Sequence, residues 1–525
     1  MNPGTATEIA VEWVYPGAEA YEWMRDTEHW PAPMPPMELW LHKHWPSGLD
    51  RAWEEVGMEA PAVFYRFQYA GPFLYARESP YEPERMMRNV LRYREVSAKY
   101  GGPLKFWQNF CRPRVERVCQ ELAASDGSAG LLVIAELWAY GFHQTFTSLA
   151  LLFEPGMRLS AMLAEASGED APLVALEVLP GGENATQAID AEIWDLAELA
   201  RRTPAVTRVM TGASDEDLLA LLRREPDASA FLSAFDALID RHGSRSQGWE
   251  LVMPTWRERP EAPLSLIRAQ LASGSVSPAQ VAAGSEARRR EATERALSQL
   301  PSEKHEEFSK TVARLDGIVR IREDRAYWQM VLAGEVRALL LRIGARMVTT
   351  GAIDRADDVF LLEPEDIEGN PSVDLGGLVA ERRAAWERWR EIEPPAIIGT
   401  LAAKPSNDEA ARDELRGSAA SRGVTTGTAR IIHSPEEGAR LRRGDILVCA
   451  MSTPAWTPLF AIVAGIVTET GGPLSHPAIT AREYGIPAVV AVKGATERIG
   501  DGQTITVDGG AGIVRLNNQG ATRKS

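Results

Sequence analysis

The stretch TETGGPLSHPAITAREYGIPAVV (468–490) decides the local fold around it. The apolar β pattern AGIVTE ends at the pair Gly471–Gly472, and glycine permits the positive φ angles of a tight turn. Ser475 then stands where a helix N-cap is favoured, and Pro477 is tolerated in the first helical turn. The pattern predicts a strand, a glycine turn and a helix that begins at His476.

A helix N-terminus favours an anion, because its backbone N–H groups and the helix dipole both attract negative charge. A neutral imidazole is a competent nucleophile near pH 7, so His476 is a candidate phosphoryl acceptor. The helix N–H groups and the hydroxyls of Thr470 and Ser475 would then hold the phosphoryl group. The alternative is a histidine that only caps and packs, and these residues alone leave it open.

Working outward, short β segments and glycine turns predict a compact α/β domain over residues 423–518. Residues 399–422 have few large apolar side chains, which predicts a flexible linker. Region 1–398 starts rich in aromatic residues and proline and continues with apolar residues at helical spacing. The expected fold class is therefore α+β and multidomain, with a mainly helical region followed by the compact α/β domain.

The formal net charge of −16 argues against a nucleic-acid or anionic-membrane partner, because either needs a basic face. Three cysteines and no CxxC argue against a disulfide framework or a zinc site, and no metal site is expected. The N-terminus shows no targeting segment, so we expect a soluble, cytoplasmic protein. The P-loop, GxSxG and HExxH motifs are all missing, as is a GxGxxG between a strand and a helix.

The opening stretch resembles the phosphohistidine swivelling domain of the phosphoenolpyruvate-utilising (PEP-utilising) enzymes. This family includes phosphoenolpyruvate synthase, pyruvate phosphate dikinase, rifampin phosphotransferase and phenylphosphate synthase. The family pattern is approximately T-x-x-G-G-x-x-S-H-x-A-I-x-A-R-E-x-G-I-P-A-V, which the chain matches from Thr468 to Val489. Flanking segments at 423–431, 444–456 and 501–514 agree with it. By this resemblance His476 is the covalent phosphoryl carrier.

The middle of the chain resembles the substrate-binding region of rifampin phosphotransferase and phenylphosphate synthase-like proteins. The resemblance rests on RHGSRSQGWELVMPTWRERP (241–260) and on the helix IREDRAYWQ (321–329), among others. We recognise neither an ATP-grasp domain nor a pyruvate-binding barrel, so the resemblance implies one subunit of a split dikinase. ATP and Mg²⁺ would be bound mainly by a partner ATP-grasp subunit, which predicts a hetero-oligomer.

Aromatic side chains of the first 150 residues are candidates to line a pocket for a planar apolar ring, with ordinary core packing as the alternative. They are Trp30, Trp45, Phe64, Tyr65, Trp138 and Phe142. His143 interrupts an apolar helix and is our candidate base for an acceptor hydroxyl. The alternative is a hydrogen-bonded core histidine.

Four further candidates lie in the middle region. Arg245 is a candidate to clamp a phosphoryl group bidentately, and His242 to line the substrate pocket. Their alternative is a helix C-cap with solvated charges. Arg322 and Glu323 begin a charged helix segment, and the resemblance favours them as catalytic residues over a plain solvated face.

The leading hypothesis is a phosphotransferase with a phosphohistidine intermediate. A partner converts ATP to AMP and phosphate while it phosphorylates His476, and the phosphoryl group then passes to a small phenolic hydroxyl. We expect an acceptor such as phenol or a lignin-derived hydroxyaryl ketone, because apolar surface favours ring burial. The alternatives are a component of an antibiotic (rifampin-like) phosphotransferase and a non-enzymatic phosphohistidine carrier or regulatory protein.

Overall fold

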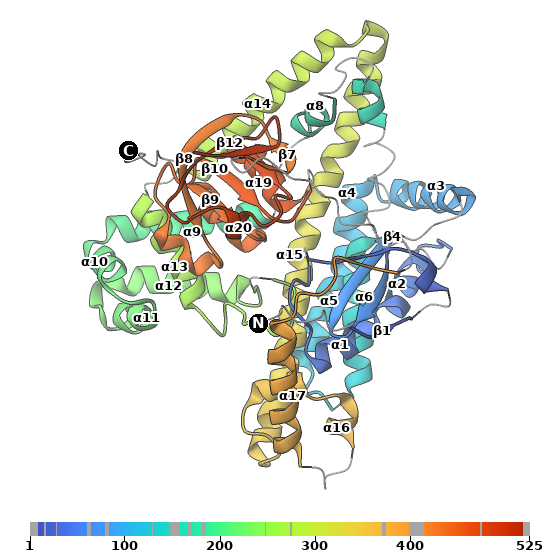
Figure 1. Ribbon diagram of the computed structural model, residues 1–525, viewed down its shortest axis with the longest axis vertical. Helices are drawn as coiled ribbons and strands as arrows, with labels where there is room; N and C mark the ends of the chain where they lie inside the picture. The colour runs from blue at the N-terminus through green and yellow to red at the C-terminus, as the bar shows by residue number, and fades with distance from the viewer. Residues whose placement is uncertain are drawn as a thin grey trace, which may run out of the picture. The chain divides into compact units, whose positions relative to one another are not determined.

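The computed structural model describes residues 9–517, apart from short gaps (Figure 1). The gaps are 15–16, 28, 60–64, 79–82, 129, 148–157, 165–170, 180–184, 247, 274–275, 370–373, 400–413 and 473–474. The chain forms two compact units. The first contains Met1–Ala150, Trp249–Met253 and Trp328–Asn407, and the second contains Leu151–Gly248, Pro254–Tyr327 and Asp408–Ser525. Within the described residues, no helix has the length and apolar character needed to cross a membrane.

The first unit combines an antiparallel sheet with helices. Its strand order is β1-β3-β4-β2-β5. The strand β2, near the start of the chain, pairs with β5, which follows more than 350 residues later. The strands are β1 (Val11–Glu12), β2 (Trp23–Arg25), β3 (Tyr65–Ala70), β4 (Phe73–Glu78) and β5 (Ile397–Ile398). The helices are α1 (Pro36–Lys43), α2 (Trp45–Glu54), α3 (Pro83–Lys99), α4 (Pro103–Phe106), α5 (Arg112–Ala124), α6 (Leu131–Phe146), α16 (Pro364–Glu368) and α17 (Leu375–Arg390).

The core of the first unit is built from the aromatic residues that the sequence concentrates near its start. Trp45 stacks on Phe142 with ring centroids 3.9 Å apart, and its edge meets Trp138 at 5.0 Å. Helices α2 and α6 approach closely at Gly48, where a Cβ would lie 2.5 Å from the backbone carbonyl carbon of Ala139. This position therefore requires glycine, and the close contact brings the two aromatic-bearing helices together.

The second unit begins as a helical layer. Its helices are α8 (Ala171–Glu177), α9 (Ala185–Arg202), α10 (Pro204–Gly212), α11 (Asp215–Arg224), α12 (Ser229–His242), α13 (Glu261–Ser273) and α14 (Pro278–Gln299). The long helix α15 (His305–Thr349) contributes residues up to 327 to this unit and the remainder to the first. The helical middle region predicted from apolar spacing is confirmed.

The C-terminal part of the second unit is a mixed sheet with strand order β6-β13-β12-β8-β9-β10-β11-β7. Strands β8 to β11 are parallel, and the others join antiparallel. The strands are β6 (Glu414–Arg416), β7 (Ser418–Ser421), β8 (Val424–Ile431), β9 (Ile446–Cys449), β10 (Gly465–Thr468), β11 (Ala488–Val490), β12 (Thr504–Asp508) and β13 (Ile513–Leu516). Short helices are α18 (Thr457–Phe460), α19 (His476–Tyr484) and α20 (Ala495–Arg498).

The structure confirms the predicted α+β class. It differs from the sequence-based expectation over part of the predicted linker. Residues 414–421, which their composition assigned to the flexible linker 399–422, form β6 and β7, because their backbones pair with β13 and β11. Residues 400–413 lie outside the described part. The charged segment before β9 forms a 3₁₀ stretch, Pro435–Arg440, and not an α-helix.

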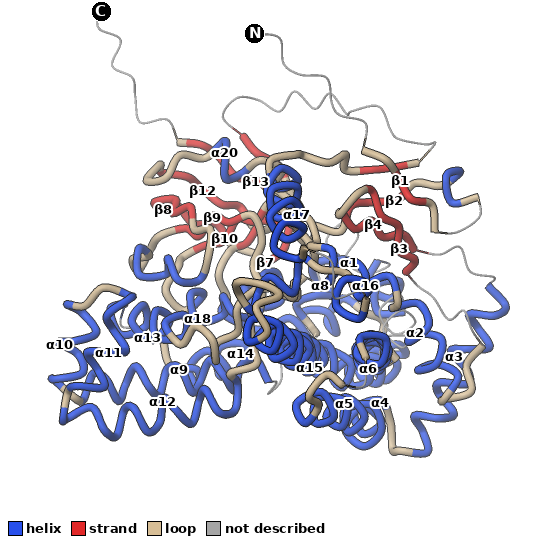
Figure 2. The backbone as a smooth tube through the Cα atoms, turned by 90° about the horizontal axis from the view of Figure 1, so that it is seen from below, coloured by secondary structure: helices blue, strands red, loops and turns tan. Residues whose placement is uncertain are grey.

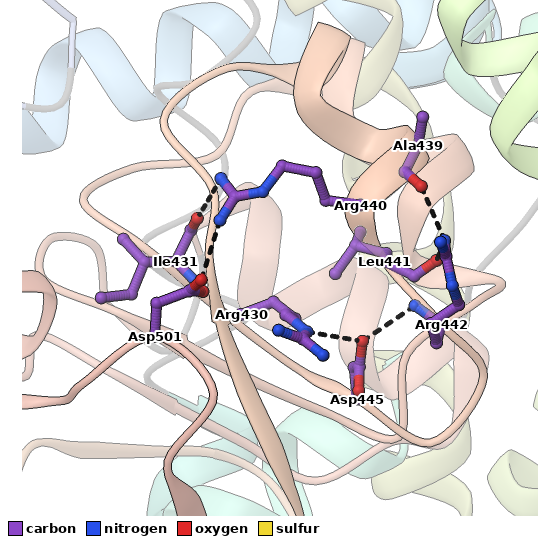
Figure 3. Close-up of polar contacts among 8 residues, drawn as sticks. All are labelled: Arg430, Ile431, Ala439, Arg440, Leu441, Arg442, Asp445 and Asp501. Carbon is purple, nitrogen blue, oxygen red and sulfur yellow. Dashed lines mark hydrogen bonds and ion pairs between the residues drawn. The ribbon is translucent and has the colours of Figure 1, made fainter.

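Polar contacts fix the connection between β8 and β9 (Figure 3). The Asp445 carboxylate accepts from Arg430 Nε at 3.2 Å and from the Arg442 backbone N–H at 2.8 Å. Arg440 donates to the Ile431 carbonyl at 3.1 Å and to Asp501 at 2.9 Å. This network determines where β9 enters the sheet, and β10, which leads to His476, pairs directly with β9.

Two apolar layers hold the C-terminal sheet in the second unit. On one face, side chains from β9, β10, α18 and α19 share a buried cluster with α9, α12 and α13. The strands accordingly lie over these helices (Figure 2). On the other face, Leu415, Ile446, Val467 and Val507 pack with residues of the α20 region. The first layer places the N-terminus of α19 against the helical part of the same unit.

Candidate active site

The strand β10 leads through a glycine turn into α19, as the sequence predicted. Gly471 has φ +102°, and a Cβ there would lie 2.7 Å from Ser475 Oγ, so the turn needs glycine. Ser475 is the N-cap residue, but its hydroxyl donates to the Gly472 carbonyl at 2.7 Å and does not cap a helix N–H. His476 is the first helical residue, and the Ile479 N–H bonds the Ser475 carbonyl at 3.1 Å.

The imidazole of His476 is largely enclosed, with 12% of its side chain exposed. Its Nε2 lies 3.2 Å from Thr457 Oγ1 and 3.5 Å from Thr480 Oγ1. Its Nδ1 lies 3.8 Å from Glu323 Oε2, which is ion-pair range and too long for a good hydrogen bond. The two ring nitrogens therefore face different chemistry, a carboxylate on one side and hydroxyl groups on the other.

Glu323 lies on α15 and is only 6% exposed. Burial by itself raises the pKa of this carboxyl, but His476, Arg322 and Arg325 outweigh burial, and the net pKa lies below the ordinary value. The carboxyl is therefore ionised at neutral pH. The structure thus brings together three of the predicted catalytic residues, His476, Arg322 and Glu323.

The arrangement favours one placement of the imidazole proton. An ionised Glu323 attracts a proton onto Nδ1, which leaves the lone pair on Nε2. Thr457 has a single hydroxyl proton, which its Oγ1 donates either to Nε2 or to the Pro454 carbonyl 2.9 Å away. With the proton on Nδ1, His476 Nε2 is available as a nucleophile.

The two predicted phosphate-binding hydroxyls both face backbone carbonyls. Thr470 Oγ1 donates to the Ala450 carbonyl at 3.2 Å, and Ser475 Oγ donates to Gly472 as described. Both residues flank the turn that precedes His476. Their role in holding a phosphoryl group, together with that of Gly471 and Gly472, stays a prediction.

Arg245 and His242 lie in the same unit as His476. Burial lowers the pKa of Arg245 to about 10, opposed by Tyr327, Asp190 and Glu323, so the guanidinium remains charged at neutral pH. His242 Nδ1 lies 3.2 Å from the Tyr327 hydroxyl, and its Nε2 lies 3.3 Å from Glu192. Burial lowers the pKa of His242 despite Glu192. His242 therefore forms polar side-chain contacts, and its role as a pocket residue stays a prediction.

His143, Trp138 and Phe142 lie on α6 in the first unit. His143 is 2% exposed, and its ring meets Trp45 edge-on at 5.7 Å. Burial lowers the pKa of His143 to about 3, so the imidazole is neutral and a weak base. Trp138, Phe142 and Trp30 belong to the same buried core. The core-packing alternative describes these contacts, and the low pKa weighs against His143 as an acceptor base.

Phe64 lies outside the described residues, and Tyr65 is the first residue of β3. Two threonines that contact the imidazole, Thr457 and Thr480, were not among the predicted site residues. Thr480 stands one helical turn after His476, so the i, i+4 rule for neighbours on a helix face could have identified it. Thr457 follows directly after a segment used for the family resemblance, yet no local pattern indicates its contact with the histidine.

Two known protein domains match segments of this chain, and each matched segment contains residues of the candidate site. The PEP-utilising enzyme, mobile domain, matches residues 441–512, which include His476. The rifampicin phosphotransferase fourth domain matches residues 144–323, which include Arg245 and Glu323.

Three curated relatives illustrate the similarity. Chondramide synthase cmdD from Chondromyces crocatus is 30% identical over 73% of this chain and 10% of its own length. The uncharacterized phosphotransferase YvkC from Bacillus subtilis is 29% identical over 68% of this chain and 45% of its own. A rifampicin phosphotransferase from Streptomyces sviceus is 31% identical over 63% of this chain and 40% of its own.

The chain thus spans less than half the length of each of these relatives. The chain itself carries the histidine-bearing mobile domain and the helical domain that supplies Glu323. These matches confirm the resemblance inferred from the motif around His476. Over residues 441–512 the chain thus carries a mobile domain of the PEP-utilising enzyme type, and over residues 144–323 a fourth domain of the rifampicin phosphotransferase type.

Proposed function

We propose that this chain is a phosphotransferase subunit in which His476 carries a phosphoryl group to the hydroxyl of a small aromatic molecule. The phosphoryl group originates from ATP, which a partner ATP-grasp subunit binds with Mg²⁺ and converts to AMP and phosphate. The observation that supports this proposal most directly is the pairing of His476 Nδ1 with the buried carboxylate of Glu323 at 3.8 Å. That pairing leaves Nε2 as the nucleophilic nitrogen.

The first step forms a P–N bond. The Nε2 lone pair attacks the β-phosphorus of ATP, and the P–O bond to AMP breaks. Water then cleaves the remaining phosphoanhydride bond and releases phosphate, so that one phosphoryl group stays on the ring. The proton on Nδ1 stays, so the phosphorylated ring carries a positive charge beside the Glu323 carboxylate. Opposite charges within this distance stabilise each other, and more so when both groups are mostly buried.

In the second step the phosphoryl group passes from Nε2 to the oxygen of the acceptor hydroxyl. The acceptor hydroxyl attacks the phosphorus, the electrons of the P–N bond return to Nε2, and the hydroxyl proton leaves to a base or to water. Positively charged groups such as Arg322 would neutralise the transferring phosphoryl group. His143 was our candidate base, and its pKa of about 3 makes it poorly matched to a phenolic proton.

Two acceptor classes follow from different observations. The aromatic composition of the first unit supports a phenolic acceptor, such as phenol or a hydroxyaryl ketone. Relatives named rifampicin phosphotransferase support an antibiotic hydroxyl as the second candidate. The two classes share the same carrier chemistry and differ only in the group that receives the phosphoryl.

The test combines the chain with its ATP-grasp partner, ATP and Mg²⁺, and supplies phenols or rifampicin as acceptors. AMP release and phosphorylated product are measured by mass spectrometry. We expect His476→Ala to abolish product formation and His433→Ala, a histidine on the same sheet domain, to leave it unchanged. Phosphopeptide mapping should find the label on His476, and a label on another histidine alone would refute the proposal.

A further inference from the structure

A narrow crevice in the second unit lies next to the hydroxyl that contacts the His476 ring. Side chains of α9 and α18 line it, together with the segment that follows α12. They include Thr186, Asp190, Arg245, Trp256 and Thr457. Because Thr457 Oγ1 is also 3.2 Å from His476 Nε2, the crevice begins beside the nucleophilic nitrogen.

Two side chains in this crevice are buried without hydrogen-bond partners for some of their polar atoms. Arg245 is 2% exposed, and within the described part of the chain neither its Nε nor its Nη2 has an acceptor. Thr186 is 4% exposed, and among the same residues its Oγ1 has no partner either. Leaving such buried groups unpaired destabilises the fold, so native structures rarely tolerate it without a reason.

The chemistry of the unpaired groups points to an oxyanion. A guanidinium presents N–H donors in a planar fork that matches two phosphate oxygens, and a threonine hydroxyl donates to a third. Arg245 also lies over the Trp256 ring, with its guanidinium carbon 5.2 Å from the ring centroid, which holds the fork in one plane.

The crevice also contains a carboxylate, Asp190, which would repel an anion. Its oxygens are engaged elsewhere, because Oδ2 accepts from the Tyr484 hydroxyl and Oδ1 accepts from Gln270 Nε2 at 3.3 Å. Burial raises the pKa of Asp190 to about 6 despite both hydrogen bonds, so the group can also take up a proton when negative charge arrives.

We propose that Arg245 and Thr186 form a pocket for the phosphoryl group carried on His476 Nε2. The pocket neutralises the phosphoryl charge and shields it from water while the histidine domain is docked as in this structure. This inference rests on the proposed function, since it requires a phosphohistidine at position 476. It adds a residue, Thr186, and a role in protecting the intermediate.

The test measures the lifetime of the phosphohistidine without any partner protein. Phosphoramidate transfers a phosphoryl group to histidine directly, and intact mass with peptide mapping reports the label on His476. We expect Arg245→Gln to shorten its lifetime at pH 7.5 by about 10-fold, the effect of losing one charge-assisted hydrogen-bonded contact. Thr186→Val, which keeps the side-chain shape, should shorten it by a smaller factor.

Matched variants separate the outcomes. Arg224→Gln, an exposed arginine at the end of α11, should leave the lifetime unchanged. If Arg245→Gln does not fold, Thr186→Val alone decides. Equal lifetimes in wild type, Arg245→Gln and Thr186→Val overturn the pocket while leaving the proposed function intact. Absence of label on His476 in the wild type refutes the proposed function and the pocket together.

A second arm distinguishes free phosphate from the histidine-bound group. Inorganic phosphate is titrated into unphosphorylated His476→Ala protein, followed by calorimetry. Phosphate binding that needs Arg245, combined with a phosphohistidine lifetime that does not, would assign the crevice to free phosphate and overturn the proposal. A lifetime that depends on Arg245 supports the proposal whether or not free phosphate also binds.

Discussion

The effect of Glu323 on His476 depends on the negative charge of its carboxylate and not on the shape of its side chain. The carboxylate lies 3.8 Å from Nδ1 and favours the proton there, while it also stabilises the positive ring of the phosphohistidine. We predict that Glu323→Gln slows formation of the phosphohistidine by about 10–100-fold, equivalent to about 1–3 kcal/mol of lost stabilisation. Phosphohistidine formation with the ATP-grasp partner is the measurement.

Glu306→Gln serves as the control for that change, because Glu306 lies on the same helix with 80% of its side chain exposed. Its rate should equal that of the wild type. A Glu323→Gln protein that is phosphorylated at the wild-type rate would show that the carboxylate neither orients the ring nor stabilises its charge.

A second residue-level prediction concerns backbone strain just after β11. Ala491 has φ +58°, in the left-handed region that favours glycine. We predict that Ala491→Gly stabilises the chain by about 0.5–1 kcal/mol, because relief of strain exceeds the added entropy of the unfolded chain. Urea unfolding measures the difference, and a destabilised variant would contradict it.

At this scale the sequence predicts the position of His476 at a helix start but not the surroundings of its ring. The glycine turn and the helix start at His476 are local features, so the printed sequence predicts both. The partners Glu323 and Thr457 come from distant segments, and only the packing of α15 and α18 with α19 in one unit brings them together. The resemblance favoured Glu323, yet no spacing in the chain predicts that it meets Nδ1.

At the scale of elements, a buried polar contact links the helix α19 to α9. The Tyr484 hydroxyl, at the end of α19, donates to the buried Asp190 carboxylate on α9. We predict that Tyr484→Phe destabilises the second unit by about 1–3 kcal/mol, because it leaves a buried oxygen without its donor. Urea unfolding measures this loss. Tyr21→Phe, at a tyrosine that is 43% exposed, should change stability little, and equal losses would contradict the prediction.

Residues 414–421 form strands although their composition is typical of a linker. Small and charged residues are typical of a linker, but a strand needs only backbone pairing. Gly417, between β6 and β7, explains the small residues, because a Cβ there would lie 2.3 Å from the Val490 carbonyl oxygen. By contrast, the helices α11 and α12 and the strands β8 to β12 carry clear apolar periodicity, and the sequence predicted them.

At the scale of the whole molecule, the two units bury different titratable groups. In the first unit Glu38 is fully buried and accepts a hydrogen bond from Trp30 Nε1 at 2.9 Å. Burial, and then the neighbouring Glu250, raise the pKa of Glu38 to about 8. Burial raises the pKa of Glu250 to about 7. On the acid side, burial lowers the pKa of His42 to about 3.

These shifts give opposite slopes of stability with pH. The folded carboxyls bind protons that the unfolded chain has already released, so their contribution is full below about pH 4.5 and is lost as pH rises through 7 and 8. Neutral His42 contributes stability above its unfolded pKa of about 6.5, which is lost as pH falls toward 3. Between about pH 4.5 and 6.5 the two carboxyls outweigh the one histidine, so these three groups make the first unit most stable near about pH 4.5.

The alkaline slope can be assigned to Glu38 by substitution. Between pH 7 and 9, ionisation of a carboxyl with a folded pKa of about 8 lowers the free energy of unfolding by about 1.4 kcal/mol. We predict that Glu38→Gln, whose amide oxygen still accepts from Trp30, removes most of this loss. Tryptophan fluorescence during urea unfolding reports mainly on the first unit, where most of the 15 tryptophans lie. Glu54→Gln, on the exposed side of α2, should keep the wild-type slope, and an unchanged slope in Glu38→Gln would show that Glu38 ionises in the folded unit without cost.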